Sequence, residues 1–251
     1  MNLELSGKNA VITGASKGIG RSIALALAEE GANVAICARG EESLIATEKE
    51  ITDKGVNVFA AMCDVGDDKS LNVFLDSVKL NLGGVDILVN NVSALNFGDE
   101  IKDWEASLNL DLMAGVRATQ KVVPWMIESG GGSILFISSI SGLESGSPPS
   151  YAAAKAAIIS YSKTMAVQLA PKNIRVNTIT PGSIEFAGGV WDMAKQYNRP
   201  LYDMVLGSIP FGRLGSPAEI GNVAAFLVSP RASWITGSCI PVDGGQHRSN
   251  V

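Results

Sequence analysis

The chain has 251 residues, of which 46% are hydrophobic and 18% are charged, and its formal net charge is −5. This composition is typical of a globular protein and excludes a disordered one, and the length is within the range of a single α/β domain. The negative charge argues against nucleic acid as the main partner.

The N-terminus lacks the cationic start and apolar core of a signal peptide, and no uncharged apolar run is long enough to span a membrane. The three cysteines, Cys37, Cys63 and Cys239, match no metal-binding spacing. The only histidine, His247, lies in the C-terminal tail, where we expect it to be exposed. We therefore expect a cytoplasmic protein with reduced thiols, no metal site and no membrane partner.

In the first half of the chain, short apolar runs alternate with segments of helical periodicity. A glycine-rich turn, Thr13-Gly14-Ala15-Ser16-Lys17-Gly18-Ile19-Gly20, follows the first apolar run and opens the first helical segment. Continuous short apolar runs are typical of strands that are buried on both faces. In chain order we expect a strand at 9–13, a helix at 19–30, a strand at 33–38, a helix at 41–54, a strand at 56–63, a helix at 68–82 and a strand at 85–89.

The second half continues this alternation. A long helical stretch at 104–129 contains Pro124, which we expect to interrupt it. The stretch at 183–210 is irregular, with aromatic side chains among glycines and prolines, and so long a stretch within a compact domain is usually functional. The other expected elements are a strand at 132–138, a helix at 151–169, a strand at 174–179, a helix at 217–228 and a strand at 238–242.

The alternation of strands and helices predicts an α/β fold of the doubly wound Rossmann type. We expect one domain over residues 1–251, with a parallel sheet of about seven strands and helices on both of its faces. The irregular stretch at 183–210 would form a substrate loop or lid.

The glycine-rich turn predicts a dinucleotide-binding site because it follows a strand and opens a helix. Glycines let the backbone approach a pyrophosphate, and the helix N-terminus supplies N–H donors and the positive end of a dipole. At the tip of the second strand, Ala38-Arg39 stands where a carboxylate would hold the ribose of NAD. Arg39 can bind a 2′-phosphate and Lys17 can add a second cation, so we expect NADP(H). NAD(H) is the alternative, in which both cations are only surface charges.

Tyr151 and Lys155 are four residues apart on the predicted helix at 151–169 and therefore share one face of it. A cation beside a phenol favours the ionised form of the phenol. Such a phenol can exchange a proton with a carbonyl or alcohol oxygen. Together with the dinucleotide site, the pair predicts a nicotinamide-dependent oxidoreductase.

With these motifs in this order, the chain resembles the short-chain dehydrogenase/reductase family over essentially its whole length. Any one of the motifs is common by accident, whereas the full set at these spacings is specific. The matching features are the turn at 13–20, Asp64 after the third strand, Asn90-Asn91 after the fourth, Asn109 in Ser107-Leu-Asn-Leu, Ser139, Tyr151-x-x-x-Lys155 and Pro181-Gly182.

The resemblance implies a role for each matching residue. Tyr151 would be the catalytic acid and base, and Lys155 would assist it and hold the nicotinamide ribose. Ser139 would hydrogen-bond the substrate oxygen, and Asn109 would hold a water near Lys155. Asn109 could instead only cap or bend its helix, and Ser138 rather than Ser139 could face the site, since a strand sends neighbours to opposite faces. The implied cofactor contacts are Gly14, Ser16, Lys17, Gly18, Ile19, Gly20, Arg39, Asp64, Val65, Asn91, Tyr151, Lys155, Pro181, Gly182 and Ile184.

Two departures from the family pattern concern the substrate side. Val92-Ser93 follow Asn91 where the family has Ala-Gly, which should narrow the floor of the site. Phe186 stands where the family commonly has a threonine that touches the cofactor, which predicts a lost contact and an apolar wall. The expected pocket suits an apolar or cyclic ketone, although some of its aromatic residues could instead pack in the core or at a subunit interface. Its expected residues are Ser93, Ser141, Phe186, Trp191, Tyr197 and Tyr202.

Two other functions compete with this interpretation. Many similar sequences reduce a 3-oxoacyl thioester on acyl carrier protein, but the end of the long helix, Met126-Ile-Glu-Ser129, lacks the expected basic residues, and Lys172 alone lies at another docking position. A catalytically silent NADP-binding regulator would typically lose the tyrosine or lysine, and here all four active-site residues are present. The resemblance also implies self-association as a homotetramer or dimer.

Overall fold

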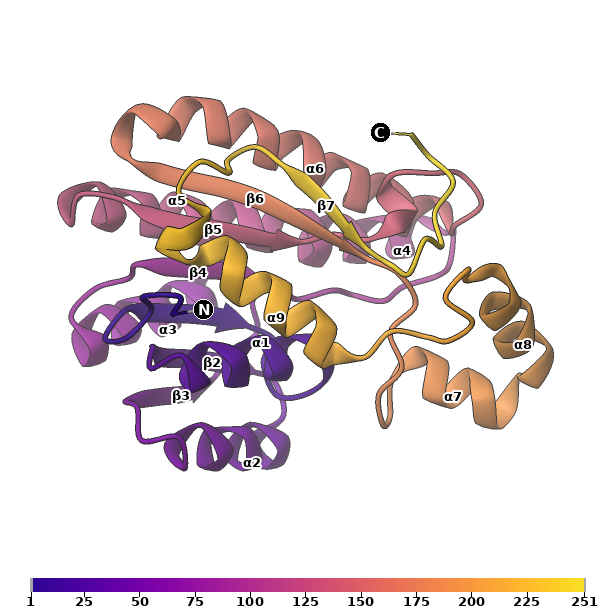
Figure 1. Ribbon diagram of the computed structural model, residues 1–251, viewed down its shortest axis with the longest axis horizontal. Coiled ribbons are helices and arrows are strands. Elements are labelled where there is room, and N and C mark those ends of the chain that lie inside the picture. The colour runs from indigo at the N-terminus through magenta and orange to yellow at the C-terminus, as the bar shows by residue number, and fades with distance from the viewer. Residues whose placement is uncertain (1, 251) are drawn as a thin grey trace.

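A parallel sheet of seven strands runs through the protein, whose computed structural model describes residues 2–250 (Figure 1). The strands are β1 (Asn9–Thr13), β2 (Asn33–Ala38), β3 (Val58–Met62), β4 (Ile87–Asn90), β5 (Gly132–Ile137), β6 (Ile174–Pro181) and β7 (Cys239–Val242). Their order is β3-β2-β1-β4-β5-β6-β7, and every neighbouring pair is parallel. The predicted Rossmann-type α/β fold is therefore confirmed.

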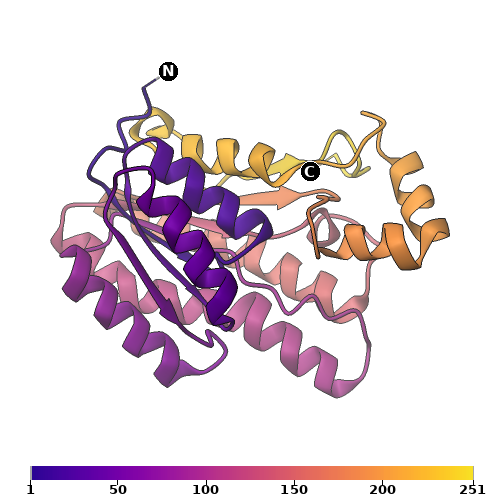
Figure 2. The same ribbon diagram turned by 90° about the horizontal axis from the view of Figure 1, so that it is seen from below.

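Helices cover both faces of this sheet, which explains why its strands are apolar on both sides. The helices α1 (Gly18–Glu29), α2 (Glu41–Thr52) and α9 (Pro217–Val228) bury their apolar residues on one face. On the other face lie α3 (Asp68–Leu82), α5 (Ala114–Glu128) and α6 (Pro149–Leu169). Figure 2 shows α9 and α6 on opposite sides of the strands. None of the helices within residues 2–250 is both long and apolar enough to cross a membrane.

The predicted strands and most of the predicted helices are present, with ends that differ by at most two residues. The long helical stretch is the first exception. It begins earlier than predicted, at α4 (Ile101–Ser107), passes through a π-helical turn at Leu108–Met113, and continues as α5. Pro124 lies inside α5 and does not interrupt it. The carbonyl group that loses its hydrogen bond there belongs to Gln120, which is exposed, so water can replace the missing N–H.

The stretch at 183–210 is the second exception, because the prediction of an irregular segment is wrong. It contains α7 (Val190–Tyr197) and α8 (Arg199–Ser208). The residues that suggested irregular structure stand at the ends of these helices. Gly189 precedes α7, and Pro200 occupies the first turn of α8, where a missing N–H costs nothing. In Figure 1 both helices project beyond the end of the sheet toward which the strands point.

The turn that leads into α9 is fixed by one carboxylate. Glu219 accepts hydrogen bonds from the backbone N–H of Ser216 (2.8 Å) and from two nitrogens of Arg213 (3.0 and 2.6 Å). The Arg213 hydrogen bond, followed by that of the Ser216 backbone, lowers the pKa of Glu219 to about 2. Gly215, in the same turn, pairs with the backbone at Ile184. Glu219 therefore supports a segment next to the carboxyl end of β6.

We expect Glu219→Gln to lower the melting temperature near neutral pH by an amount equivalent to about 1 kcal/mol, because it weakens a helix cap. A carboxylate whose pKa is lowered by folding stabilises the protein above its usual pKa, and that stabilisation is lost as the pH falls through the lowered value. The difference between variant and wild type should thus shrink between pH 4.5 and about 2. Melting curves followed by circular dichroism measure it. Glu42→Gln, at an exposed residue of α2, is the control, and a difference that does not change with pH would contradict the assignment.

Candidate active site

A cavity of about 1020 Å³ opens at the carboxyl ends of the strands. Its walls come from the loops after β1, β2 and β3 on one side and from the loops after β4, β5 and β6 on the other. It therefore lies where the strand order reverses, between β1 and β4, which is the place where doubly wound folds bind ligands. The α7–α8 segment borders it through Val190, Trp191, Leu201 and Val205.

The glycine-rich turn forms one wall of this cavity. Gly14 and Gly18 have φ values of 67° and 56°, in the left-handed region that favours glycine. A Cβ atom on Gly20 would lie 2.4 Å from the carbonyl oxygen of Gly14, so a side chain there would break the turn. The turn leads into α1, and the first N–H groups of a helix have no partner within it. This backbone suits a pyrophosphate.

Asn91 holds the glycine-rich turn in place. Its Nδ2 donates to the carbonyl oxygens of Thr13 and Gly14, both at 3.0 Å, and its backbone N–H donates to Thr13 Oγ1 at 3.1 Å. Asn91 also lines the cavity, whereas Asn90 is buried beneath it with its Nδ2 3.5 Å from Thr119 Oγ1. Asn91 thus joins the end of β4 to the end of β1.

Two cations stand at the end of the cavity formed by β2 and β3. Lys17 and Arg39 are both exposed and line the cavity, and neither forms an ion pair within the part of the chain that the structure describes. Because β2 ends at Ala38, no carboxylate occupies the tip of that strand. Asp64 and Val65 follow β3 and line the same end, and Asp64 Oδ1 accepts a hydrogen bond from Gly66 N at 2.9 Å.

On the opposite wall, Pro181, Gly182 and Ile184 all line the cavity. The carbonyl oxygen of Ser183 accepts from Gly215 N, and Glu185 N donates to the Gly215 carbonyl oxygen, both at 2.9 Å. The backbone N–H and C=O of Ile184 take no part in this pairing, because neighbouring residues of an extended chain point to opposite sides. They are therefore available to a bound ligand.

The C-terminal tail packs beside this wall. Gln246 lines the cavity and accepts a hydrogen bond from Ser183 N at 2.8 Å. The prediction that His247 is exposed is wrong. Its side chain is 16% exposed, and its Nδ1 lies 2.5 Å from Asp243 Oδ2.

Tyr151 and Lys155 lie on the first turns of α6 and both line the cavity. The Lys155 side chain is 2% exposed. Its Nζ donates to the carbonyl oxygen of Ile137 at 3.1 Å and lies 5.6 Å from the centre of the Tyr151 ring. The structure thus brings the phenol and the ammonium together, as their spacing on the helix predicts.

The two candidate serines after β5 have different hydrogen bonds. Ser138 is buried, and its Oγ donates to the Lys155 carbonyl oxygen at 2.8 Å. Ser139 Oγ accepts from the backbone N–H of Ser141 at 3.1 Å. A hydroxyl has one proton to donate, and that of Ser139 remains available to a ligand in the cavity. Of the two, Ser139 is the one equipped to donate.

The structure does not place Asn109 near Lys155, and the prediction that it holds a water there is wrong. Asn109 Nδ2 donates to the Gly66 carbonyl oxygen at 3.1 Å, and its Oδ1 accepts from Arg117 Nη2 at 2.5 Å. The neighbour of Lys155 is Asp111, whose Oδ1 lies 3.0 Å from Lys155 Nζ. Asn109 and Asp111 are two positions apart within the π-helical turn, which is about half a turn, so they face different sides.

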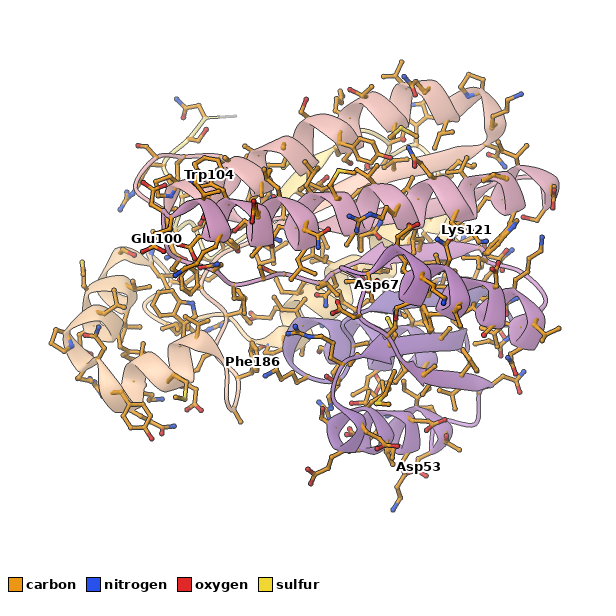
Figure 3. The ribbon with its side chains drawn as sticks, turned by 180° about the vertical axis from the view of Figure 1, so that it is seen from behind. Asp53, Asp67, Glu100, Trp104, Lys121 and Phe186 are labelled. Atoms are coloured by element: carbon orange, nitrogen blue, oxygen red, sulfur yellow. The ribbon has the colours of Figure 1, made fainter. Side chains whose placement is uncertain are left out.

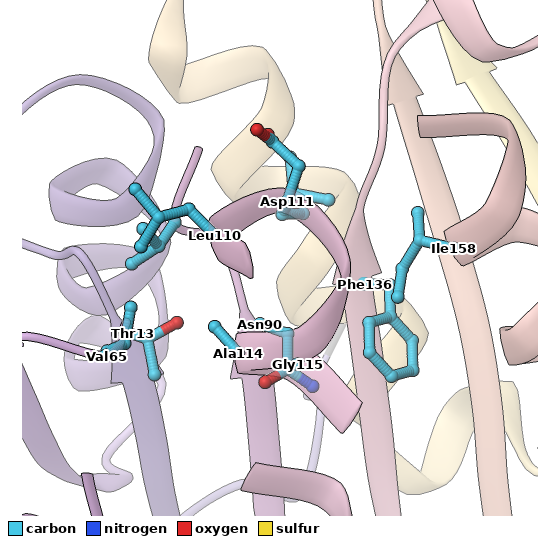
Figure 4. A pocket seen from close by; sticks show the side chains of 11 residues that line it. Thr13, Val65, Asn90, Leu110, Asp111, Ala114, Gly115, Phe136 and Ile158 are labelled. Carbon is cyan, nitrogen blue, oxygen red and sulfur yellow. The ribbon is translucent and has the colours of Figure 1, made fainter. Parts of the chain in front are cut away.

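Helical spacing could have identified Asp111 from the sequence. The buried side of α5 carries Ala114, Ala118 and Val122, and stepping back by three from Ala114 reaches Asp111 rather than Asn109. Figure 4 shows the turn that carries Asp111 above Asn90 and beside Phe136, around a small cavity of about 10 Å³.

The ion pair determines the charge state of Lys155. Burial alone would lower the pKa of Lys155, but the attraction of the Asp111 carboxylate, with a further contribution from Tyr151, outweighs burial and raises it. Lys155 is therefore charged, and its charge is balanced by a carboxylate that is itself 0% exposed.

The structure brings Ser93, Ser141, Phe186 and Trp191 to the cavity but leaves two predicted residues outside it. The Tyr197 side chain points to solvent and is 76% exposed. Tyr202 is buried behind the wall, where its hydroxyl donates to Glu185 Oε2 at 2.7 Å. Both stand on helices that the sequence did not predict, so the side of the helix they occupy was unknown.

Among the cavity residues that the sequence did not indicate are Phe97 and Glu144. Phe97 lies edge-on to the Tyr151 ring at 5.9 Å, and Glu144 lines the cavity after β5. Phe97 belongs to the loop between β4 and α4, where no periodicity indicates which side chains point inward.

A Cβ atom on Gly18 would lie 2.5 Å from the Phe186 ring, so Phe186 packs on the glycine-rich turn. Figure 3 shows Phe186 between the α7–α8 segment and the N-terminal half of the protein.

Comparisons with known proteins agree with this geometry. The family model described as enoyl-(acyl carrier protein) reductase matches residues 14–247. A 3-oxoacyl-(acyl carrier protein) reductase of Thermotoga maritima is 37% identical over 249 residues, which are 97% of this chain and 99% of that protein. The family model covers residues 14–20 of the glycine-rich turn and the cluster around Lys155.

Two solved structures are similar over nearly the whole chain. The 7α-hydroxysteroid dehydrogenase complexed with NADH and 7-oxo glycochenodeoxycholic acid has a TM-score of 0.91 and 36% identity, covering 99% of this chain and 97% of that chain. The L-sorbose reductase of Gluconobacter frateurii complexed with NADPH and L-sorbose has a TM-score of 0.92 and 34% identity, covering 99% of this chain and 100% of that chain.

Proposed function

Because the chain belongs to the short-chain dehydrogenase/reductase family, we propose that it is an NADP(H)-dependent oxidoreductase that interconverts an uncharged apolar or cyclic ketone and its secondary alcohol. One observation carries the proposal. Tyr151 and the fully buried Lys155 border the same cavity as the glycine-rich turn, so a proton donor and a dinucleotide site share one space.

The residues of the cavity fit a nicotinamide dinucleotide. The backbone of the glycine-rich turn would hold the pyrophosphate, since Gly14, Gly18 and Gly20 leave no room for side chains. Asp64 and Val65 would contact the adenine, and the free backbone groups of Ile184 would meet the carboxamide. Lys155 would hold the nicotinamide ribose. When bound, the nicotinamide supplies or accepts the hydride at the carbonyl carbon.

Side chains of the protein transfer the proton to and from the substrate oxygen. In reduction, Tyr151 donates its phenolic proton to the substrate oxygen, and in oxidation its ionised form takes the proton back. Ser139 donates a hydrogen bond to the same oxygen and stabilises the charge that develops on it. The charged Lys155 stabilises the ionised form of Tyr151.

The preference for NADP(H) is supported by the charges at the β2 end of the cavity. Arg39 and Lys17 have no carboxylate partners within residues 2–250, and β2 ends without an acidic residue. A 2′-phosphate would give both cations a partner, whereas the ribose hydroxyl of NAD would find no carboxylate to accept its hydrogen bond.

The scarcity of charged side chains at the end of the cavity near Tyr151 supports an uncharged substrate. Apart from the buried Lys155, the charged side chain that lines the cavity there is Glu144. On the α7–α8 segment, Lys195 is paired with Glu185 and Arg199 with Asp203. Apolar walls from Phe97, Phe186 and Trp191 suit a hydrocarbon skeleton.

A 3-oxoacyl thioester on acyl carrier protein is the second candidate, supported by the similarity to the Thermotoga maritima reductase. Lys172 gives it little support, because this residue precedes β6 and the cavity lies at the carboxyl ends of the strands. The exposed Arg248 is better placed for docking an acidic carrier protein, since its backbone N–H bonds Glu144 Oε2 at 2.8 Å. A silent NADP-binding regulator is disfavoured because Tyr151, Lys155 and Ser139 are all present.

A substrate panel tests the proposal directly. With NADPH we expect oxidation, followed by absorbance, in the presence of cyclic and other apolar ketones, and slower oxidation with a 3-oxoacyl carrier protein. Tyr151→Phe should lower turnover by more than about 10²-fold, because it removes the proton donor, while NADPH binding persists. NADPH binding without turnover of any ketone would favour the regulator, and a marked preference for the carrier thioester would favour the second candidate.

The cofactor preference can be tested at Arg39. Arg39→Asp should raise the KM for NADPH by roughly tenfold or more, because it removes a charged hydrogen bond, and should improve the use of NADH. Lys49→Asp on α2 makes the same change in net charge away from the cavity and should leave both KM values unchanged. An unaltered preference in the Arg39 variant would show that this residue is only a surface charge.

Alanine substitutions at Ser139 and Ser138 test which of the two serines contacts the substrate oxygen. Ser139→Ala should lower kcat by about 10²-fold or more, because it removes a donor to the developing oxyanion. Ser138→Ala removes the hydrogen bond to the Lys155 carbonyl and should instead cost about 1 kcal/mol of stability with a smaller loss of kcat. Steady-state kinetics and melting curves distinguish them, and the reverse pattern would assign the substrate contact to Ser138.

A further inference from the structure

The ion pair between Lys155 and Asp111 places a negative charge inside the catalytic cluster. The resemblance to the family predicts an uncharged asparagine near the lysine, and here the neighbour is a carboxylate 3.0 Å away. Asp111 is held in position by the backbone N–H of Ala94, which donates to its Oδ2 at 3.1 Å. Both side chains of the pair are almost completely buried, so water screens their charges little.

Other charged groups near α6 are engaged elsewhere. Asp103 on α4 accepts from Asn96 Nδ2 and from Glu100 N, both at 2.9 Å. Arg175, at the start of β6, donates to the carbonyl oxygens of Leu227, Ile235 and Ser229. Glu144, after β5, accepts from Arg248 N. The remaining charged residues on α6 and on elements packed against it are Lys102, Glu105, Lys163 and Lys172. Among residues 2–250, Asp111 is the one carboxylate within ion-pair distance of Lys155.

We propose that Asp111 is a positioning residue of the reaction, whose carboxylate neutralises Lys155, keeps Tyr151 protonated to higher pH and so extends ketone reduction to higher pH. The proposal rests on the oxidoreductase function proposed above. An unbalanced lysine would stabilise the ionised phenol, which is the form that oxidation requires. A lysine already paired with a carboxylate stabilises it less, so the protonated phenol that reduction requires persists.

The variant that isolates this charge is Asp111→Asn, which keeps the shape of the side chain. With the negative charge removed, the ionised form of Tyr151 should be favoured at lower pH. The rising limb of alcohol oxidation and the falling limb of ketone reduction should both move to lower pH, on the order of one pH unit. Rates in both directions across the pH range measure these limbs. No shift, or a shift to higher pH, would overturn the proposal.

Two further variants separate charge from structure. Asp111→Glu retains the carboxylate and should keep the wild-type limbs, at some cost in rate. Asp103→Asn removes another buried carboxylate of the same helical stretch, which contacts Asn96 rather than Lys155, and should lower stability without moving the limbs. An equal shift in the Asp103 and Asp111 variants would assign the effect to general loosening and overturn the proposal.

A measurement independent of activity completes the test. The tyrosinate absorbance of the wild type minus that of Tyr151→Phe follows the proton on Tyr151 alone, and the same difference can be taken in the Asp111→Asn background. We expect Tyr151 to be protonated near neutral pH in the wild type and to ionise at lower pH in the variant. If Asp111→Asn does not fold, the wild-type titration still decides, since a phenol already ionised near neutral pH would overturn the proposal. If the tyrosinate titrations give the expected result but no substrate is turned over, the outcome would count against the proposed function and not against this inference.

Discussion

A buried ammonium group is the constraint on which the site depends. Lys155 is removed from water, and burying an unpaired charge would cost several kcal/mol. Two groups prevent this: the carbonyl oxygen of Ile137 at the end of β5, and the carboxylate of Asp111. The position of α6 against β5 and the position of the helical stretch that carries Asp111 are thus fixed by the same atom. Tyr151, one turn before Lys155, is placed with it.

The π-helical turn at Leu108–Met113 carries both Asn109 and Asp111. A π-helical turn widens the helix by one residue and changes the direction of the side chains that it carries, and such turns are frequent at functional sites. Here it lies between α4 and α5, where Asp111 meets Lys155 and Asn109 meets Gly66. One local distortion therefore directs two neighbouring polar side chains to different partners.

The sequence predicts the parts of this protein that depend on local chemistry. Buried parallel strands appear as apolar runs, and the glycine-rich turn stands out because glycine adopts its left-handed backbone most readily. Ser139, which the family pattern indicates, keeps a free hydroxyl donor in the structure, and its contact with the substrate stays a prediction. The predictions fail where the contacts of a side chain depend on the direction in which it points around its helix. Asn109 matched a motif but lies about half a turn away from the side that faces Lys155, and Tyr197 and Tyr202 stand on helices whose glycines and prolines resembled those of a loop.

The charges around the cavity divide it by function. The unpaired cations, Lys17 and Arg39, stand at the β2 end, where a phosphate would neutralise them. At the reactive end, Lys155 and Asp111 form an ion pair without net charge, so the charge that develops on the substrate oxygen would be met by the hydrogen bond from Ser139 and the proton from Tyr151. A site built in this way depends on a phenol that still holds its proton. The aspartate beside the lysine, in place of an uncharged amide, favours that state of the phenol.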